Sequence, residues 1–465
     1  MKKIRSLSLI LLLVLVLQNS LAYAVPATDS CMTLDAKIAL AGNSQLLPTA
    51  QAVVLYAPDS DTMLYSWNAD QELDPSGMNK IMTALLALEN GELEAMVSVT
   101  STALNSVEIG AMSASLRAGE SLTLRDLLYL MMVGSANDAA AVIAEHISGS
   151  QAAFVTSMNQ RAKELGCTKT YFLNPTGLSV EGQYTTARDL AKITARALKM
   201  EAFVELFSAV EYTVPASDTT REHQVFTTNY MMSDATVRDQ LDDRVTGGKT
   251  GALSTTDRSL ISTAEQDNQR YLAVVMSAKS SMNDTGTAVR TFGNFSETRL
   301  LLDHAFSQYG QCQLLSGDKV MAQFPVINGE NDLAVSARHS VSALMPKDMK
   351  ADRVSFRCEE SLGDISAPIS KGAIVGIVEL WYDGICVAQG DLVAMHDVKK
   401  IGESATTLKP QVNVEKTSFG TVALVCLFVL LGVIALTVLT AIVLRTIHVA
   451  HYRKHRNHAR RRPRS

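Results

Sequence analysis

Residues 75–89 read PSGMNKIMTALLALE, and this stretch decides how the rest of the chain is interpreted. From Asn79 onward the apolar residues recur at helical spacing, with Ile81 and Leu85 near one face, so a helix is predicted to begin there. Lys80 then lies in the first turn of that helix. A lysine at such a position is usually a solvated side chain, so the segment carries chemistry only if other motifs converge on it.

Two other short clusters follow at long intervals. Ser135-Ala136-Asn137 comes directly after an apolar helical stretch, and Lys249-Thr250-Gly251 lies between a turn-prone stretch and a strand. Each cluster alone is a weak signal, because short motifs of this kind occur by chance. The order and spacing of all three clusters are far more specific, and together they predict one composite site.

The elements around these clusters are typical of an α+β protein, with strands at both ends of a domain and helices between them. The strands are predicted as a hairpin within 46–66 and a buried strand at 270–278, and the helices as beginning at 79 and covering 123–148, 151–165, 186–208 and 297–309. A sheet built from distant segments is therefore expected, and residues 46–310 are assigned to this domain.

A second, smaller domain is predicted at 311–400. Short β-prone stretches separated by turn residues recur at 319–327, 332–336, 353–357, 373–382 and 386–395. This pattern indicates an all-β domain. The following segment, 401–418, is polar with few large apolar residues and is expected to be a tether.

The two ends of the chain predict export and a membrane anchor. Residues 1–24 combine three early positive charges, an apolar run and the small residues Ala22-Tyr23-Ala24, which is typical of a signal peptide leading into 25–45. An uncleaved N-terminal anchor is the alternative. Residues 419–444 contain no charged side chain and are long enough to cross a bilayer.

The tail at 445–465 is strongly basic, which favours the cytoplasmic side of the membrane. A single-pass cell-membrane protein with an extracytoplasmic body is therefore expected. Four tail histidines follow at helical spacing and could bind a metal, although a basic tail against anionic lipid is the simpler interpretation. These histidines are His448, His451, His455 and His458.

The composition excludes some classes of function. The formal net charge is -5, which gives no reason to expect a nucleic acid as partner. Six cysteines are present with no C-x-x-C spacing, so a zinc site or a thioredoxin-like motif is unsupported, and no metal or cofactor is predicted for the body. Mostly unpaired cysteines are the favoured interpretation, and Cys358 with Cys386 is the first pair to test.

Together the three clusters resemble the penicillin-recognising serine acyltransferases, which use S-x-x-K, S-x-N and K-T-G. The closer resemblance is to the low-molecular-weight D-alanyl-D-alanine carboxypeptidases, peptidase family S11. It runs from about 50 to 308 and continues more weakly into the β domain; the supporting text includes 127–140, Asn174-Pro175-Thr176-Gly177-Leu178, Tyr184 to Asp189 and Ala367 to Gly372. The implied fold is β-lactamase/transpeptidase-like, an antiparallel sheet flanked by helices.

The resemblance also implies roles for individual residues. A serine hydroxyl needs a nearby base, and Lys80 can serve if burial and neighbouring cations depress its pKa. Ser135 is then implied to relay a proton, and Asn137 to bind the substrate amide.

In the third cluster, Lys249 and Thr250 are implied to bind the terminal carboxylate, and the strand through Gly251 to pair with the peptide. The backbone N–H groups of Gly77 and Ala252 are implied to form the oxyanion hole.

One residue departs from the family pattern. A gapless placement puts Gly77 where the family carries its nucleophilic serine, and the helix that follows matches without a shift. Glycine cannot form an acyl-enzyme, and losing a nucleophile costs roughly 10⁴ to 10⁶ in kcat. Ser76 lies four residues before Lys80 and could approach it, but its hydroxyl would be turned by about 100° from the required direction. A helix N-cap is the simpler role for Ser76.

The sequence therefore predicts a catalytically impaired family member, a pseudoenzyme. It would hold a peptidoglycan stem peptide ending in D-Ala-D-Ala, or a wall-enzyme partner, without cutting it. An active serine D,D-carboxypeptidase that uses Ser76 or a rearranged site is the first alternative. A non-enzymatic wall-binding or scaffold protein of the membrane is the second.

Overall fold

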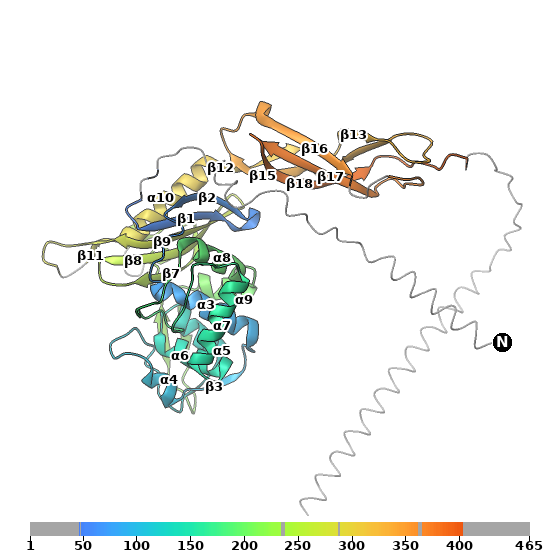
Figure 1. Cartoon of the computed structure of the whole chain (residues 1–465). Coiled ribbons are helices and arrows are strands. Elements are labelled where there is room, and N and C mark those ends of the chain that lie inside the picture. Colours follow the sequence, from blue (N-terminus) through green and yellow to red (C-terminus); the bar gives the residue numbers. More distant parts are fainter. Residues whose placement is uncertain (1–45, 47, 234–237, 287–288, 361–364, 403–465) are drawn as a thin grey trace, which may run out of the picture. The chain divides into compact units, whose positions relative to one another are not determined.

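The structure is a computed structural model, and it describes residues 46, 48–233, 238–286, 289–360 and 365–402 (Figure 1). The predicted signal peptide, lead-in, membrane span and basic tail lie outside the described residues, as does nearly all of the tether. Among the described residues, no helix is both long enough and apolar enough to cross a membrane.

A five-stranded antiparallel sheet organises the larger domain, in the order β2-β1-β9-β8-β7. Its strands are β1 (Ala52–Ala57), β2 (Thr62–Trp67), β7 (Val245–Ala252), β8 (Asp257–Gln266) and β9 (Gln269–Lys279). The first strand pairs with the last, which confirms the predicted hairpin, the predicted buried strand and the sheet built from distant segments. The edge strand β7 carries the Lys-Thr-Gly cluster.

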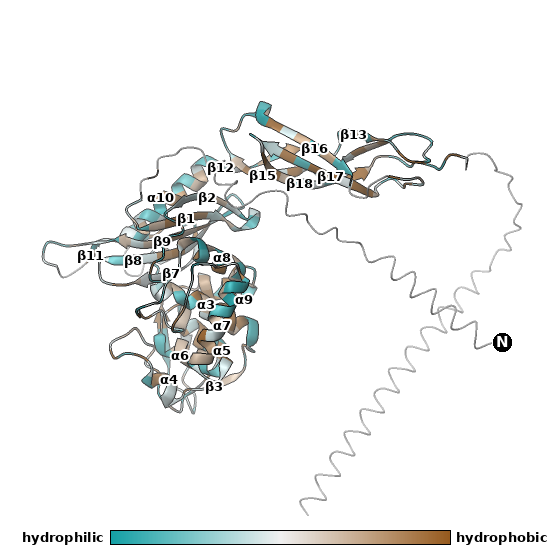
Figure 2. Ribbon diagram, viewed as in Figure 1, coloured by the Kyte–Doolittle hydropathy of each residue, from teal (hydrophilic) through white to brown (hydrophobic). Residues whose placement is uncertain are grey.

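The sheet is covered on both faces, because successive side chains of a strand point to opposite sides. Val54 and Val274 pack into a core formed with the helical cluster. Val53 and Val275 pack into a second core with helix α10 (Gly293–Gln308), so α10 and the other helices lie on opposite faces of the sheet (Figure 1). Figure 2 shows the strands of this sheet in brown where apolar residues dominate.

The helical cluster supplies two of the three motifs. Its helices are α3 (Lys80–Asn90), α4 (Ser101–Asn105), α5 (Leu124–Met132), α6 (Asn137–Ser148), α7 (Gln151–Glu164), α8 (Ala187–Ala197) and α9 (Glu201–Ser208). The helix predicted at 123–148 is interrupted between α5 and α6, because Ser135 has a left-handed backbone with φ +58°. The helix predicted at 186–208 is likewise two helices, α8 and α9.

The smaller domain is all-β, as predicted. One sheet has the order β13-β14-β18-β17-β16, and β12 pairs with β15. The strands are β12 (Tyr309–Leu315), β13 (Val320–Phe324), β14 (Leu333–Ala337), β15 (Val341–Pro346), β16 (Val354–Glu360), β17 (Ile374–Tyr382) and β18 (Ile385–Ala394). The sequence did not predict β12 and β15. The domain has an apolar core of its own, which includes Leu333, Val378 and Leu392.

The cysteine pairing first suggested by the sequence is wrong. Cys358 is free, as are Cys167 and Cys312, whereas Cys386 is disulfide-bonded. Cys358 lies on β16 and Cys386 on β18, and β17 runs between these two strands. Neighbouring strands are about 4.8 Å apart, so two strand spacings exceed the reach of a disulfide.

Candidate functional site

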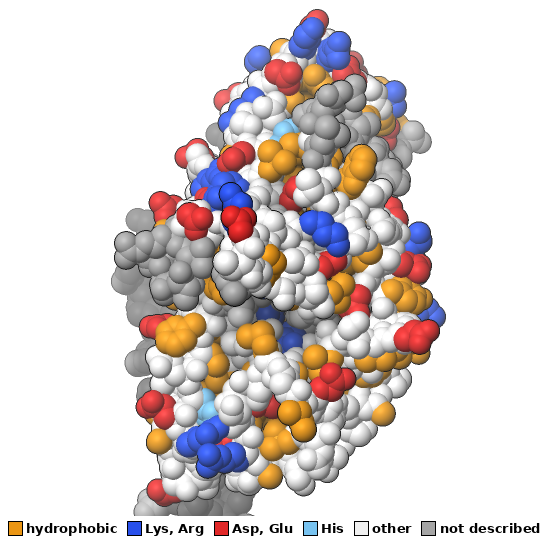
Figure 3. Space-filling model, turned by 90° about the vertical axis from the view of Figure 1, so that its left-hand side faces the viewer, with side chains coloured by type: hydrophobic (Ala, Val, Ile, Leu, Met, Phe, Trp, Pro, Cys, Tyr) orange, Lys and Arg blue, Asp and Glu red, His pale blue; other side chains and the backbone are white. Residues whose placement is uncertain are grey.

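The three sequence motifs meet at one cavity of about 370 Å³. It lies where the start of α3, the turn between α5 and α6, strand β7 and the start of α10 come together. Its lining residues are Gly77, Lys80, Met112, Ser135, Asn137, Thr176, Gly177, Leu178, Thr228, Tyr230, Thr250, Gly251, Ala252, Arg258, Asn294 and Phe295. Figure 3 shows a face of the molecule with lysine or arginine side chains recessed in a hollow.

Gly77 lies in a short 3-10 turn, Ser76–Asn79, pressed against strand β7. A Cβ added to Gly77 would lie 2.7 Å from the carbonyl oxygen of Thr250 and 3.7 Å from Ser135 Oγ. The first distance is shorter than real Cβ contacts allow. The backbone of β7 therefore occupies space that a side chain at position 77 would need.

Ser76 does not face the cavity. Its side chain is 1% exposed, its backbone is left-handed with φ +46°, and its Oγ has no hydrogen-bond partner. A Cβ added to Gly251 would lie 2.0 Å from this Oγ, so the hydroxyl lies against the backbone of β7. The N-cap role suggested for Ser76 is wrong, because a capping side chain would accept a backbone N–H bond.

Lys80 is buried at the floor of the cavity, with 2% of it exposed. Its Nζ donates a hydrogen bond to Asn137 Oδ1 at 2.7 Å and another to the carbonyl oxygen of Thr176. Burial, and then the charge of Lys249, lowers the pKa of Lys80 well below its ordinary value, while Asp138 opposes the shift. This amine has the properties of a base in a site of this kind.

Ser135 and Lys249 form a second buried pair. Lys249 Nζ donates to Ser135 Oγ at 3.0 Å and to the carbonyl oxygen of Thr250 at 3.2 Å. Lys249 is 1% exposed, and burial lowers its pKa to about 7. Lys249 is not among the residues that line the cavity, although both of its partners, Ser135 and Thr250, line it.

A loop beside the cavity is held by Asp138, the residue after Asn137. The Asp138 carboxylate accepts bonds from Ser113 Oγ at 2.6 Å, from the Ala114 N–H at 3.0 Å and from the Leu116 N–H at 2.9 Å. The Asn137 N–H donates to the Met112 carbonyl at 2.9 Å. The start of α6 thus fixes both the asparagine and the loop that brings Met112 to the cavity.

The Asn-Pro-Thr-Gly loop at 174–177 forms another part of the cavity wall, through Thr176 and Gly177. Asn79 Nδ2 donates to the Asn174 carbonyl at 2.6 Å, and Asn174 Oδ1 accepts from the Gly177 N–H at 2.7 Å. Gly177 has φ +75°, and an added Cβ would lie 1.9 Å from the Ser76 carbonyl oxygen. Only glycine fits here, for both reasons.

Sequence reasoning missed six lining residues, which are Met112, Thr228, Tyr230, Arg258, Asn294 and Phe295. Arg258 lies on β8 opposite Ala252, the last residue of β7. The signal was present for Arg258, because a strand that follows Lys249-Thr250-Gly251 after a tight connection must run back beside it. Nothing local to Asn294 or Phe295 indicates that the start of α10 reaches the cavity.

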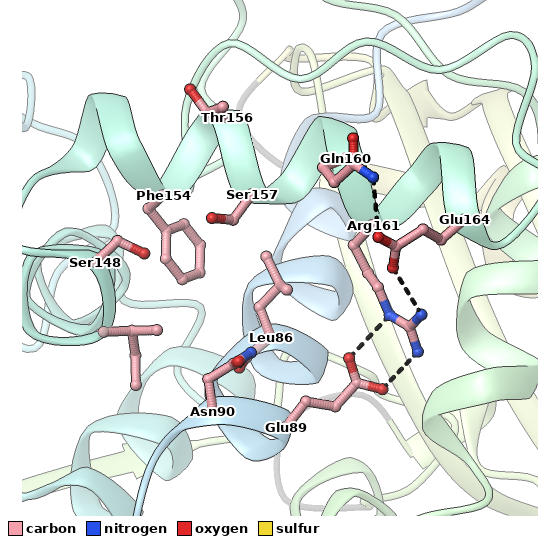
Figure 4. A pocket seen from close by; sticks show the side chains of 11 residues that line it. Leu86, Glu89, Asn90, Ser148, Phe154, Thr156, Ser157, Gln160, Arg161 and Glu164 are labelled. Carbon is pink, nitrogen blue, oxygen red and sulfur yellow. Dashed lines mark hydrogen bonds and ion pairs between the residues drawn. The ribbon is translucent and has the colours of Figure 1, made fainter.

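A larger cavity of about 620 Å³ lies among α3, α6 and α7, away from the motifs. Figure 4 shows Arg161 at one side of it, bonded to Glu89 and Glu164. Gln160 also bonds to Glu164 at 2.9 Å. The charged groups of this cavity pair with one another, so it offers no charge for a ligand and is not the candidate site.

A metal centre finds no support in the described part of the chain, where no three side chains of His, Cys, Asp or Glu are grouped to hold an ion. The tail histidines His448, His451, His455 and His458 lie outside the described residues.

The fold and the cavity define a penicillin-recognising, transpeptidase-like protein. Residues 41–280 match the model of the D-alanyl-D-alanine carboxypeptidase family, peptidase S11, and residues 309–400 match the C-terminal domain of penicillin-binding protein 5. The chain therefore belongs to the S11 family of D-alanyl-D-alanine carboxypeptidases. This family acts on peptidoglycan stem peptides that end in D-Ala-D-Ala.

Similar proteins cover most of the chain. It is 31% identical over 365 residues to the D-alanyl-D-alanine carboxypeptidase DacF of Bacillus subtilis (strain 168), covering 77% of this chain and 88% of that protein. It is 28% identical over 367 residues to DacC of Escherichia coli (strain K12), covering 76% and 85%. The crystal structure of penicillin binding protein 5 from Haemophilus influenzae matches with a TM-score of 0.59 at 28% identity, covering 77% of this chain and all (100%) of that one.

Proposed function

We propose that this chain is a catalytically impaired member of the family that binds peptides ending in D-Ala-D-Ala without cleaving them. The observation that carries the proposal is Gly77, which stands where the family resemblance expects the nucleophilic serine. No hydroxyl is present at that point of the cavity wall. Lys80, Asn137 and the edge strand β7 through Thr250, Gly251 and Ala252 line the cavity and could hold the peptide.

Ser76 is a poor substitute for the missing nucleophile. Its Oγ lies against Gly251 rather than in the cavity, and no hydrogen bond joins it to Lys80. Moving this hydroxyl into the cavity requires a change at a turn that Gly177 packs against. The position of its hydroxyl therefore disfavours an active site built on Ser76.

One observation favours an active alternative with a rearranged site. Ser135 Oγ lies 3.0 Å from the amine of Lys249, whose pKa of about 7 would let part of the population act as a base. This pair has the separation expected of a nucleophile and its base. We place this alternative second for one reason. Ser135 is bonded to Lys249, but among the described residues no hydrogen bond joins it to Lys80, the second amine that could receive its proton.

The test is covalent labelling of the purified full-length chain with a β-lactam, followed by intact mass measurement and peptide mapping. The proposal expects no adduct, because acylation needs a nucleophilic oxygen at position 77. A stoichiometric adduct on Ser135 would establish an active enzyme with a rearranged site, and an adduct on Ser76 would establish an active enzyme that uses Ser76. Either adduct ends the proposal of impairment.

We also propose that the protein is anchored in the cell membrane with both folded domains outside the cytoplasm. The support is the signal-like start, the uncharged stretch 419–444 and the basic tail. Protease added to intact spheroplasts should digest the body and leave the tail protected. Protection of the body until the membrane is broken would contradict this orientation.

A further inference from the structure

The lysine implied to bind the peptide carboxylate, Lys249, is not among the residues that line the cavity. Lys249 is 1% exposed, and its amine donates hydrogen bonds to Ser135 Oγ and the Thr250 carbonyl. Burial also lowers its pKa to about 7, so its charge is incomplete near neutral pH. A cation that lines the cavity is therefore a better candidate for direct contact with a carboxylate.

Arg258 is a cation of the right kind in the right place. It lines the cavity, and it pairs across the β7–β8 ladder with Ala252. Side chains directly opposite one another, and those two residues apart on one strand, share a face of a sheet, so Thr250, Ala252 and Arg258 face the same side. Thr250 and Ala252 also line the cavity, which confirms that this shared face is the cavity wall.

The guanidinium is held in place but not neutralised. Its Nε donates to the Thr255 carbonyl at 2.9 Å, and its central carbon lies 5.5 Å from the centre of the Phe292 ring. Within the described residues, neither terminal nitrogen of Arg258 has a hydrogen-bond or ion-pair partner. None of the residues lining the cavity is Asp or Glu, so nothing there competes for this charge.

Asn294 supplies a second, independent indication of a ligand at this end of the cavity. It is 2% exposed, it lines the cavity, and its Oδ1 has no hydrogen-bond partner. A buried polar atom left unpaired costs about 1–3 kcal/mol, so a ligand that pairs with it gains binding energy. Rotating the amide by 180° exchanges its oxygen and nitrogen, so Asn294 can also donate a bond to a carboxylate oxygen.

Further positive potential comes from the helix that carries Asn294. Asn294 and Phe295 lie in the first turn of the 16-residue helix α10, whose N-terminus carries a partial positive charge. The Thr250 hydroxyl, bonded to the Thr228 hydroxyl at 2.5 Å, adds a polar group on the adjoining strand. A guanidinium, an amide, a helix N-terminus and a hydroxyl thus surround one region that contains no acid.

We propose that Arg258, together with the Asn294 amide, binds the C-terminal carboxylate of the peptide, and that the cleft thereby selects peptides with a free terminal carboxylate. The inference rests on the proposed binding function, and it assigns the direct contact to Arg258 rather than to Lys249. Lys249 then acts through Ser135 and the β7 backbone as a positioning residue.

The test is calorimetric titration of the full-length chain with an N-acetylated peptide ending in D-Ala-D-Ala, as the free acid and as the C-terminal amide. The variants are Arg258→Gln, Arg258→Lys and the matched control Arg270→Gln. Arg270 lies on β9 at the opposite end of the β8–β9 hairpin, and its ion-pair partner among the described residues is Glu265 at 3.5 Å. Thermal unfolding of each variant reports whether it is folded.

Wild type should prefer the acid to the amide. Arg258→Gln should weaken binding of the acid about tenfold or more and leave binding of the amide unchanged, because only the acid carries the charge. Arg258→Lys should recover part of the acid affinity, and Arg270→Gln should match wild type. The preference of wild type should shrink at high salt.

Three results would overturn the inference. If wild type and folded Arg258→Gln bind the acid with equal affinity, Arg258 does not contact the carboxylate, and the proposed binding function still stands. Equal losses for acid and amide would mean that Arg258 only shapes the cavity. No heat with either peptide in wild type would overturn the proposed binding function and this inference together.

Discussion

Adding a side chain at position 77 tests how closely strand β7 packs against the turn that carries Gly77. In Gly77→Ser, the new Cβ would lie 2.7 Å from the Thr250 carbonyl oxygen, whereas ordinary contacts begin near 3.4 Å. The backbone dihedral is no obstacle, because Gly77 does not have a positive φ. Strand β7 must therefore shift by several tenths of an ångström, against a ladder in which Thr250 is paired with Leu260.

The expected cost follows from that contact. Overpacking a well-packed site costs about 1–3 kcal/mol. Replacing glycine also restricts the unfolded chain, which returns about 0.4–1 kcal/mol. A net loss of about 1–2 kcal/mol should lower the Tm by roughly 2–8 °C for a domain of this size.

The chemical outcome should be a gain. The serine Cβ would be 3.7 Å from Ser135 Oγ and in the same cavity as the Lys80 amine, whose pKa is lowered by burial. Gly77→Ser should therefore form a covalent β-lactam adduct at position 77, partly and slowly. Gly77→Ala is the control, because it adds the same Cβ without a nucleophile.

The assay is mass spectrometry of β-lactam-treated protein beside thermal unfolding of the three chains. Gly77→Ser and Gly77→Ala should lose similar stability, and only the serine variant should gain an adduct. A serine variant that unfolds at the wild-type Tm would refute the closed-strand argument. A folded serine variant with no trace of adduct would mean that the surrounding groups no longer support acylation.

Two further predictions concern the buried lysine and the Gly177 wall. Because the pKa of Lys249 is lowered to about 7 in the folded chain, the unfolded chain binds more protons above that pH, and the free energy of unfolding should rise from about pH 7 to about pH 10. Lys249→Met should flatten this rise in urea titrations by up to about 1.4 kcal/mol per pH unit; an unchanged slope would mean that Lys249 stays charged when folded. Gly177→Ala should be destabilised far more than Gly182→Ala, because both have positive φ (+75° and +88°) but only the first would place a Cβ 1.9 Å from a backbone oxygen. Gly182→Ala should lose about 1–2 kcal/mol in the same titrations, and equal losses in the two variants would contradict the packing described for Gly177.

The sequence predicted the parts of the fold that depend on local periodicity. Helix α3, strand β9 and the β1–β2 hairpin follow from the spacing of their apolar residues, and in the structure these residues pack into the cores. The break between α5 and α6 was missed, although Gly134, Ser135 and Asn137 interrupt the apolar pattern there. Ser135 has a left-handed backbone there and accepts a hydrogen bond from Lys249, a tertiary contact that no local pattern encodes.

The site was predictable to the extent that it consists of motifs. Lys80, Ser135, Asn137 and Thr250 come together because three clusters on separate elements converge. The direction of a side chain is a different matter. Whether Lys249 lines the cavity depends on which face of an edge strand is covered, and that is decided by the helices packed against it.

The distribution of satisfied and unsatisfied polar groups distinguishes the two ends of the cleft. At the reaction centre, the Lys80 amine is bonded to Asn137 and Thr176, and the Lys249 amine to Ser135, so neither amine needs a group at position 77. A buried amine that had lost its partner would cost several kcal/mol or lose its charge.

At the other end, Arg258 and Asn294 keep polar atoms without partners in the described residues, as a ligand-binding surface does. Catalysis requires an unsatisfied group where bonds change, whereas binding requires unsatisfied groups where the ligand is held. Among the residues that line the cavity, the buried side-chain atom without a partner is Asn294 Oδ1, whereas the unpaired Ser76 Oγ lies against the backbone of β7 rather than in the cavity. The backbone of β7 fills the space beside Gly77. That arrangement supports the proposal that this cleft holds a peptide rather than cutting one.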